Sequence, residues 1–260
     1  MCTLSWLRTD TEYQVFFNRD EQRNRQQAVP PQPITLNSTR VLMPTDPNGG
    51  GSWISVNEHG LSLYLLNYYH SAAHPTRNTT ELISRGLLLR SLAHHRNINA
   101  VQASLISEQL TDYAPFTLAA FDLTNSSASP SGNQQVFQWS GQDLNMFAPA
   151  TLITSSSVKF DEVSPMRQQK FIDVISAGPQ TEGLTSRHLK LHASHQDGKN
   201  YQSVCMHRSD AKTVSFSHIA VRKVPQDDNN PITFNYHDGS PCETPLTHTA
   251  SLAQHDTLFG

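Results

Sequence analysis

Several classes of protein are excluded by what this 260-residue sequence has little of. It contains three cysteines, an odd and sparse set that argues against a disulfide framework. Its 19 lysines and arginines nearly balance 22 aspartates and glutamates, so a nucleic-acid partner is not expected. No apolar run approaches the roughly 18 residues of a transmembrane segment. The N-terminus, MCTLSWLRTD, has no apolar leader, so we expect a cytoplasmic protein.

The hydrophobic pattern predicts an α+β fold. The β-rich runs pair as hairpins instead of alternating with helices, which favours antiparallel sheets with helices outside them. The predicted strands are residues 2–8, 13–18, 53–57, 61–69, 116–123, 135–139, 144–154 with a break at Pro149, 201–207, 213–221 and 232–236 as an edge strand. The predicted helices are residues 82–94, a short helix from Asn97 or Asn99 to Leu110, one that starts at Ser164-Pro165, and 184–195. We expect residues 1–260 to form a single domain whose last part, 241–260, is an irregular tail.

One of the cysteines stands directly after the start methionine. Removal of Met1 would give Cys2 both a thiol and a free α-amine, whose pKa is about 8. The neutral amine can accept the thiol proton, which makes one residue both nucleophile and base. The pattern therefore suggests a hydrolase that works through Cys2, against the plainer alternative that a cysteine stands here by chance.

Polar residues end the strand that faces Cys2 in the first predicted hairpin, so residues 18–21 are expected to lie beside it. Arg19 could lower the thiol pKa and hold a substrate carbonyl or carboxylate. Asp20 could hydrogen-bond the α-ammonium. On a regular strand Asp20 points away from Arg19, so a local twist would be needed for both to reach Cys2, and Glu21 is the substitute. The plainer alternative is a solvated turn.

Two motifs carry a resemblance to a known family. The first is Met1-Cys2-Thr3 followed by FFNRDE at residues 16–21, and the second is GGSWISV at residues 50–56, which runs on to Leu66-Asn67-Tyr68. Together they resemble the NRDE family, which includes the transport and Golgi organisation 2 proteins. The resemblance is strong over residues 1–70 and thinner beyond. The pattern is also similar to N-terminal-nucleophile cysteine hydrolases such as bile-salt hydrolase and penicillin V acylase.

This resemblance implies a fold and a set of site residues. The fold is a four-layer αββα sandwich of antiparallel sheets. It implies Cys2 as nucleophile, Arg19 as its partner and Asn67 as a contributor to the oxyanion hole. The acylases carry an asparagine pair where this chain has serines, which makes those serines candidate oxyanion donors. The expected catalytic residues are Cys2, Arg19, Asp20 and Asn67, and further possible site residues are Asn18, Glu21, Ser155, Ser156 and Arg167.

No metal or cofactor is expected from the sequence. His188, His192 and His195 fall on one face of a predicted helix and could ligate a metal or haem, but a chain with 13 histidines produces such spacing by coincidence. Cys205 is interpreted as a small buried hydrophobic residue, and Cys242 as a loop residue that is reactive if exposed.

Two functions remain open at this point. The first is hydrolysis of a non-peptide amide bond in a small amide or acyl substrate. The second, implied by the transport and Golgi organisation 2 resemblance, is a non-catalytic haem- or lipid-binding protein in trafficking, with the hydrophobic ligand held beside Cys2. The sequence leaves the substrate and the oligomeric state open.

Overall fold

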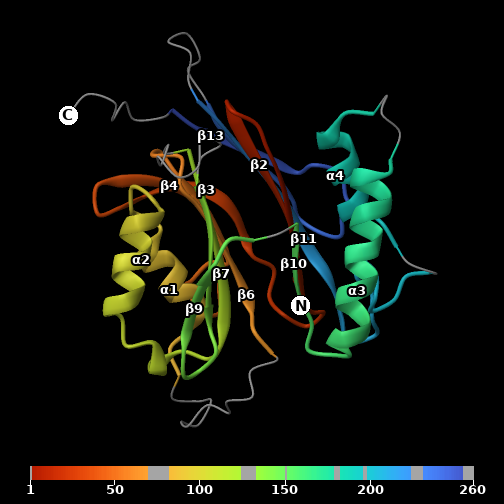
Figure 1. The fold of residues 1–260 in the computed structure, drawn as a ribbon, viewed down its shortest axis with the longest axis horizontal. Helices are drawn as coiled ribbons and strands as arrows, with labels where there is room; N and C mark the ends of the chain where they lie inside the picture. Colours follow the sequence, from red (N-terminus) through yellow and green to blue (C-terminus); the bar gives the residue numbers. More distant parts are fainter. Residues whose placement is uncertain are drawn as a thin grey trace.

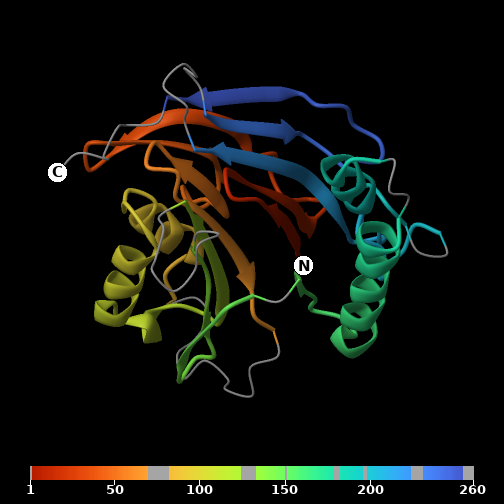
Figure 2. The ribbon, with the colours of Figure 1, turned by 45° about the horizontal axis from the view of Figure 1, so that its top comes forward.

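Two antiparallel sheets pack face to face between two layers of helices (Figures 1 and 2). The computed structural model describes residues 2–69, 82–123, 133–149, 151–178, 182–195, 198–223 and 231–253. The architecture is the expected αββα sandwich. Every strand pair between these residues is antiparallel, as the hairpin pattern of the sequence predicts.

The first sheet has six strands in the order β10-β1-β2-β11-β12-β13. Its strands are β1 (Cys2–Arg8), β2 (Glu12–Gln22), β10 (Leu152–Ser155), β11 (Ala211–Arg222), β12 (Ile232–His237) and β13 (His248–Leu252). Strand β1 therefore lies between two partners, and its first residue is held from both sides. Cys2 is opposite Arg19 on β2 and opposite Ser155 on β10.

The second sheet has seven strands in sequential order from β3 to β9. Its strands are β3 (Val29–Leu36), β4 (Thr39–Thr45), β5 (Ile54–Asn57), β6 (Ser62–Asn67), β7 (Phe116–Asp122), β8 (Asn133–Trp139) and β9 (Leu144–Phe147). The proline-rich strand β3 lies at one edge, where a missing backbone N–H leaves no ladder bond unmade. The break at Pro149 separates β9, at the edge of this sheet, from β10, at the edge of the other.

Each sheet carries its own pair of helices. Helices α1 (Arg85–Leu92) and α2 (Ile98–Ser107) pack on the seven-stranded sheet, and α3 (Phe160–Phe171) and α4 (Leu184–His192) pack on the six-stranded sheet. The described residues also form a 3₁₀ turn (Leu110–Asp112) and a π-helical turn (Ile172–Ser176). Asn97 caps α2 by accepting a hydrogen bond from the Ala100 N–H at 3.0 Å, one of the two starts that the sequence suggests.

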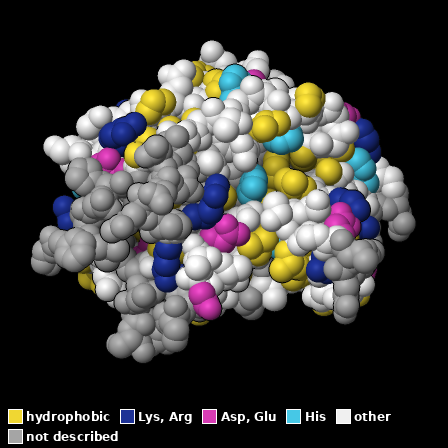
Figure 3. Space-filling view, turned by 90° about the horizontal axis from the view of Figure 1, so that it is seen from above, with side chains coloured by type: hydrophobic (Ala, Val, Ile, Leu, Met, Phe, Trp, Pro, Cys, Tyr) yellow, Lys and Arg dark blue, Asp and Glu magenta, His cyan; other side chains and the backbone are white. Residues whose placement is uncertain are grey.

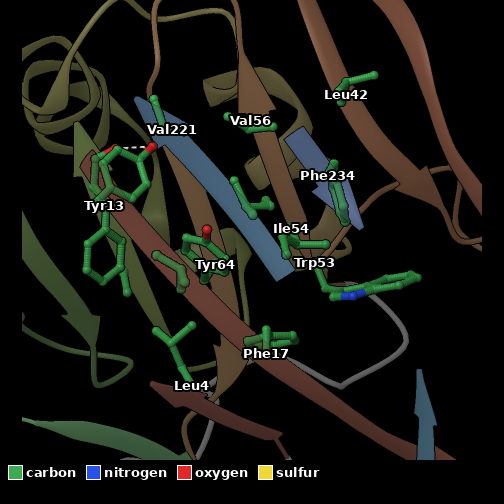
Figure 4. Close-up of a cluster of buried hydrophobic side chains, with 14 of the residues drawn as sticks. Leu4, Tyr13, Phe17, Leu42, Trp53, Ile54, Val56, Tyr64, Val221 and Phe234 are labelled. Carbon is green, nitrogen blue, oxygen red and sulfur yellow. Dashed lines mark hydrogen bonds between the residues drawn. The ribbon is translucent and has the colours of Figure 1, made fainter. Parts of the chain in front are cut away.

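The main hydrophobic core lies between the two sheets (Figure 4). Strand β2 contributes Tyr13 and Phe17, which point inward because alternate residues of a strand share a face. They pack with residues of the opposite sheet such as Ile54 and Tyr64. The Tyr13 hydroxyl donates to the Gly60 carbonyl at 2.8 Å, which gives this buried polar group a partner across the two sheets.

Several of the expected elements are wrong in detail. Helix α3 begins at Phe160, so Pro165 lies inside it instead of at its start. Its first turn carries Asp161 and Glu162, which favour a helix N-terminus electrostatically. Residues 201–207 form no strand; His207 makes a single bridge to Lys212, and β11 pairs with β2. The predicted helix 184–195 ends at His192.

The segment 241–260, expected to be irregular, contributes the edge strand β13. Strand β12, expected at an edge, consequently lies inside the sheet. Residues 254–260 lie outside the described residues, as does Met1. Among the described helices, none has the length and apolar character needed to cross a membrane.

Candidate active site

A cavity of about 490 Å³ opens beside Cys2, and we refer to it as the Cys2 cavity. Its lining comes from both halves of the sandwich. The six-stranded sheet supplies Cys2, Arg19, Asp20 and Glu21. The seven-stranded sheet and the segments next to it supply Trp53, Leu65, Asn67, Tyr69 and Arg85. The structure thus brings the four expected catalytic residues to one cavity.

Cys2 is 9% exposed and points into the space between the sheets. Burial raises the pKa of its thiol, and the positive charge of Arg19 acts in the opposite direction. Because the nucleophile in cysteine chemistry is the thiolate, a thiol in this setting needs a base at the moment of attack. An amine on the same residue would meet that need.

Arg19 links the two sheets across the cavity. Its guanidinium carbon lies 3.8 Å from the centroid of the Trp53 ring, and its Nη2 lies 3.6 Å from Glu21 Oε2. Cation–π contact and a partly buried carboxylate together fix the long side chain in one direction. Burial lowers the pKa of Arg19 and Glu21 opposes this, so the group stays charged at neutral pH.

Asp20 belongs to the lining of the Cys2 cavity, and its carboxylate contacts Thr213 and Arg167. Its Oδ1 accepts a hydrogen bond from Thr213 Oγ1 at 2.6 Å, and its Oδ2 lies 3.7 Å from Arg167 Nη2. Burial raises the pKa of Asp20 and the Arg167 charge opposes it. The neighbouring strand β11 has an irregular register between Thr213 and Ser215, opposite Asp20 and Arg19. A bulge of this kind increases the local twist of the strand that carries it, here β11.

Arg167 is fully buried behind the strands that carry the site. Its Nη1 donates to Thr3 Oγ1 at 2.6 Å and to Thr154 Oγ1 at 3.0 Å. It does not belong to the lining of the Cys2 cavity. Its position behind Asp20 makes it a support for that carboxylate, since an unpaired buried charge is costly.

Asn67 and Ser155 lie on two sides of a smaller adjoining cavity of about 80 Å³. Asn67 also lines the Cys2 cavity, and its Nδ2 donates to the Tyr69 hydroxyl at 2.6 Å. The Ser155 hydroxyl is buried and has no hydrogen-bond partner among the described residues. A buried hydroxyl in this condition is available to donate to a ligand oxygen.

The remaining two candidates take other roles in the structure. Asn18 Nδ2 donates to the carbonyls of His192 and Val204, both at 2.9 Å, and so ties β2 to the helical layer. Ser156 makes hydrogen bonds within its own turn, to the backbone of Val158. Neither residue belongs to the lining of the Cys2 cavity.

The sequence reasoning assigned no role to Trp53 or Arg85, which the structure places at the cavity. Trp53 lies in the quoted second motif, so the motif was the available signal. Arg85 is the first residue of α1, and its Nη1 donates to the Pro115 carbonyl at 2.8 Å. No described carboxylate lies within ion-pairing distance of it.

The three histidines that the sequence places on one face of the fourth helix lie in two different environments. His188 Nδ1 and His192 Nε2 both hydrogen-bond the Ser5 hydroxyl, at 2.8 and 2.9 Å. His195 lies beyond the end of the helix. Phe16 stacks on His188 and on His218, with ring centroids 4.6 and 4.5 Å apart. Histidine side chains also lie among hydrophobic ones on the face shown in Figure 3. The first two histidines are thus already occupied as internal packing and hydrogen-bonding groups.

Comparison of the sequence with protein families now adds an independent line of evidence. The profile of the family described as Transport and Golgi organisation 2 matches residues 1–240. The chain belongs to this family. A comparison with curated protein sequences gives no match.

Solved structures with the same fold as this transport and Golgi organisation 2 family member are N-terminal-nucleophile hydrolases. The C2A mutant of the conjugated bile acid hydrolase from Clostridium perfringens has a TM-score of 0.54 at 14% identity, over 98% of this chain and 97% of that one. Penicillin V acylase from Agrobacterium tumefaciens has a TM-score of 0.52 at 8% identity, over 92% and 83%. The Caenorhabditis elegans N-acylethanolamine-hydrolyzing acid amidase ortholog has a TM-score of 0.54 at 9% identity, over 95% and 100%. At these identities the likeness establishes the fold.

Proposed function

We propose that the protein is an N-terminal-nucleophile hydrolase that cleaves a non-peptide C–N bond of a small amide through Cys2, after removal of Met1. The observation that carries the proposal is the meeting of Cys2, Arg19, Asp20 and Asn67 at one cavity in this fold. The bile acid hydrolase, the penicillin acylase and the acid amidase are similar in fold and are named for reactions on amide-type substrates.

In the proposed reaction the Cys2 sulfur attacks the substrate carbonyl carbon while its thiol proton passes to the α-amine. The carbon–sulfur bond forms and the carbonyl oxygen takes the negative charge. Asn67 donates to that oxyanion, a contribution typically worth 10²–10³ in rate. Collapse of the intermediate breaks the C–N bond, and the α-ammonium gives its proton to the leaving amine. Water then hydrolyses the thioester and regenerates the thiol.

The two positioning residues act from strand β2. Arg19, held on Trp53, fixes the substrate oxygen and favours the thiolate through its charge. Asp20, held by Thr213 and backed by Arg167, accepts a hydrogen bond from the α-ammonium in the proposed reaction. In this arrangement the base is oriented by a third group, as in other activated nucleophiles.

The test is acylation of untagged protein by a thiol-directed acylating probe, with intact and peptide mass spectrometry. We expect a mass without Met1 and one acyl group on Cys2, and no acylation at that site in Cys2→Ala. A tag placed before Met1, which prevents release of the α-amine, serves as the second control. Retention of Met1 in the native protein, or equal labelling of Cys2→Ala, would contradict the proposal. Saturable binding of haem or a fatty acyl ligand with neither processing nor acylation would favour the non-catalytic alternative.

A further inference from the structure

Four metal-ligating side chains meet at a place distinct from the Cys2 cavity. They come from three segments: the turn after α4, the segment before β11, and the loop after β12. We call them the Cys/His cluster, and its members are His195, Cys205, His207 and Cys242. One ligand atom from each residue lies within 4.8 Å of the others.

Two sulfur–nitrogen distances within the cluster are close to the edge length of a tetrahedral zinc site. His207 Nε2 lies 3.6 Å from Cys205 Sγ and 3.3 Å from Cys242 Sγ. Bond lengths of about 2.3 Å for Zn–S and about 2.0–2.1 Å for Zn–N give a sulfur–nitrogen edge of about 3.6 Å at the tetrahedral angle. The rings of His195 and His207 are 5.3 Å apart between centroids and inclined by 53°, so they do not stack flat on one another.

One member of the cluster, His195, has a ring nitrogen without a hydrogen-bond partner in the described part of the chain. His195 Nε2 is buried and has no hydrogen-bond partner among the described residues. Buried ring nitrogens are normally paired, so this atom calls for a partner. A cation at the centre of the cluster would supply it.

The backbone holds the segments of the cluster in place without any metal. The Cys205 N–H donates to the Ser194 carbonyl at 3.0 Å, which joins the segment of His195 to that of Cys205. The Ser240 hydroxyl donates to the Thr213 carbonyl at 2.6 Å, which fixes the loop that carries Cys242. The site is therefore preorganised by bonds that do not involve its side chains.

We propose that the Cys/His cluster binds one Zn²⁺ ion. Two thiolates and two imidazoles are the donor set of structural zinc sites, and borderline-soft Zn²⁺ suits them better than Ca²⁺ or Mg²⁺ does. Four protein ligands leave no open coordination position, so the ion is structural and takes no part in the chemistry at Cys2. The proposal stands independently of the proposed function.

The zinc site would stabilise the wall behind Asp20. The Met206 N–H, between the two middle ligands, donates to Thr213 Oγ1 at 2.8 Å, and that hydroxyl in turn donates to Asp20 Oδ1. Binding of the ion would therefore order both the loop of Cys242 and the residue that holds the Asp20 carboxylate.

The test uses the full-length, untagged protein, because a histidine tag would itself bind zinc. We expect about one zinc ion per chain by elemental analysis. Replacement by Co²⁺ should give the absorption of tetrahedral thiolate-bound cobalt. Cys242→Ser, at a partly exposed position, and His195→Gln should each lower the zinc content about tenfold. The exposed His248→Gln is the matched control and should retain the ion.

Three results would overturn the proposal. One is a reduced, folded wild-type protein that takes up neither Zn²⁺ nor Co²⁺. A second is unchanged zinc content in both Cys242→Ser and His195→Gln. The third is a Cys205–Cys242 disulfide that persists in protein purified under reducing conditions, since both sulfurs would then be lost as ligands. Should a variant fail to fold, a chelator that leaves the wild-type melting temperature unchanged would decide against the site in the same way.

Discussion

The guanidinium carbon of Arg19 lies over the indole of Trp53, 3.8 Å from the ring centroid, and this contact joins the two sheets beside Cys2. A partly desolvated cation–π contact is worth about 1 kcal/mol, or about fivefold in a rate it controls. We expect Trp53→Leu to slow acylation of Cys2 by about that factor and Arg19→Leu to slow it further. The double variant should show less than the product of the two effects. Arg96→Leu, an exposed arginine, should leave the rate unchanged.

Asn67 is expected to act in the transition state more than in binding. Asn67→Ala should lower kcat by about 10²–10³ with little change in KM, because the amide stabilises charge that develops during reaction. Tyr69→Phe removes the present partner of the amide and should preserve kcat within a few-fold. The exposed Asn145→Ala is the matched control. Equal loss in both asparagine variants would remove Asn67 from the proposed oxyanion hole.

Arg85 predicts the charge of the substrate. It lines the Cys2 cavity, and among the described residues its guanidinium bonds the Pro115 carbonyl and no carboxylate, so its charge is available to an anionic group. Arg85→Leu should slow acylation by a carboxylate-bearing probe about tenfold, in line with a charge-assisted hydrogen bond. An uncharged probe of equal length should be affected less than about twofold. Equal slowing of both probes would mean that the residue acts through local packing.

The Asp20–Arg167 pair makes a prediction on stability. Both side chains are fully buried and their nearest atoms are 3.7 Å apart, so removal of one leaves an uncompensated charge. Asp20→Ala should lower the free energy of unfolding by about 3–5 kcal/mol in urea. The double variant with Arg167→Leu should lose less than the sum of the single variants. The exposed Asp143→Ala should change stability by less than about 0.5 kcal/mol, and an equal effect of Asp20→Ala would contradict the pairing.

The ring stack around Phe16 predicts loss of stability in mild acid. Burial lowers the pKa of His188 and of His218 from 6.5 to about 4 in the folded protein. The unfolded state therefore binds more protons between pH 6.5 and 4, and stability falls as the pH falls through that window. Each group should contribute up to about 2 kcal/mol of this loss between pH 7 and 5.

The same prediction is checked by unfolding in denaturant at several pH values. Burial also lowers the pKa of His192, the third histidine beside Phe16. His218→Gln should therefore reduce the pH slope by about a third at most. The exposed His248→Gln is the control and should keep the wild-type slope. A stability that is flat from pH 7 to 5 would show that these rings do not titrate as described.

The elements of the fold that depend on the local pattern of residues could be predicted from the sequence. The hairpin of β1 and β2 follows from alternation in residues 2–18, and its register places Arg19 opposite Cys2. The break at Pro149 is likewise local. The alternation of residues along β2 likewise predicts that Asp20 points away from Arg19, and the Asp20 carboxylate does lie 3.7 Å from Arg167.

The parts that could not be predicted depend on distant partners. Strand β13 consists of a mostly polar segment, and its pairing with β12 carries no signal in its own residues. The apolar neighbours of Cys205 predict a strand over residues 201–207. In the structure these neighbours are buried without pairing as a strand, so their apolar character reflects burial alone. Its approach to Cys242 depends on where two loops end, and no spacing along the chain reveals it.

The two walls of the Cys2 cavity come from different sheets. Evolution can therefore alter the chemistry at Cys2 and the shape of the binding space independently. One wall, from β1 and β2, carries the Cys2 sulfur, the proposed nucleophile, and its charged neighbours, and its geometry is fixed by paired strands on both sides. The other wall, around Trp53, Leu65 and Arg85, borders the same space without sharing a hydrogen-bond ladder with the first. Exchange of side chains on the second wall should therefore retune which molecules fit while the chemistry on the first stays intact. Under the proposed function, a library confined to that wall is the natural starting point for changing which amide is cleaved.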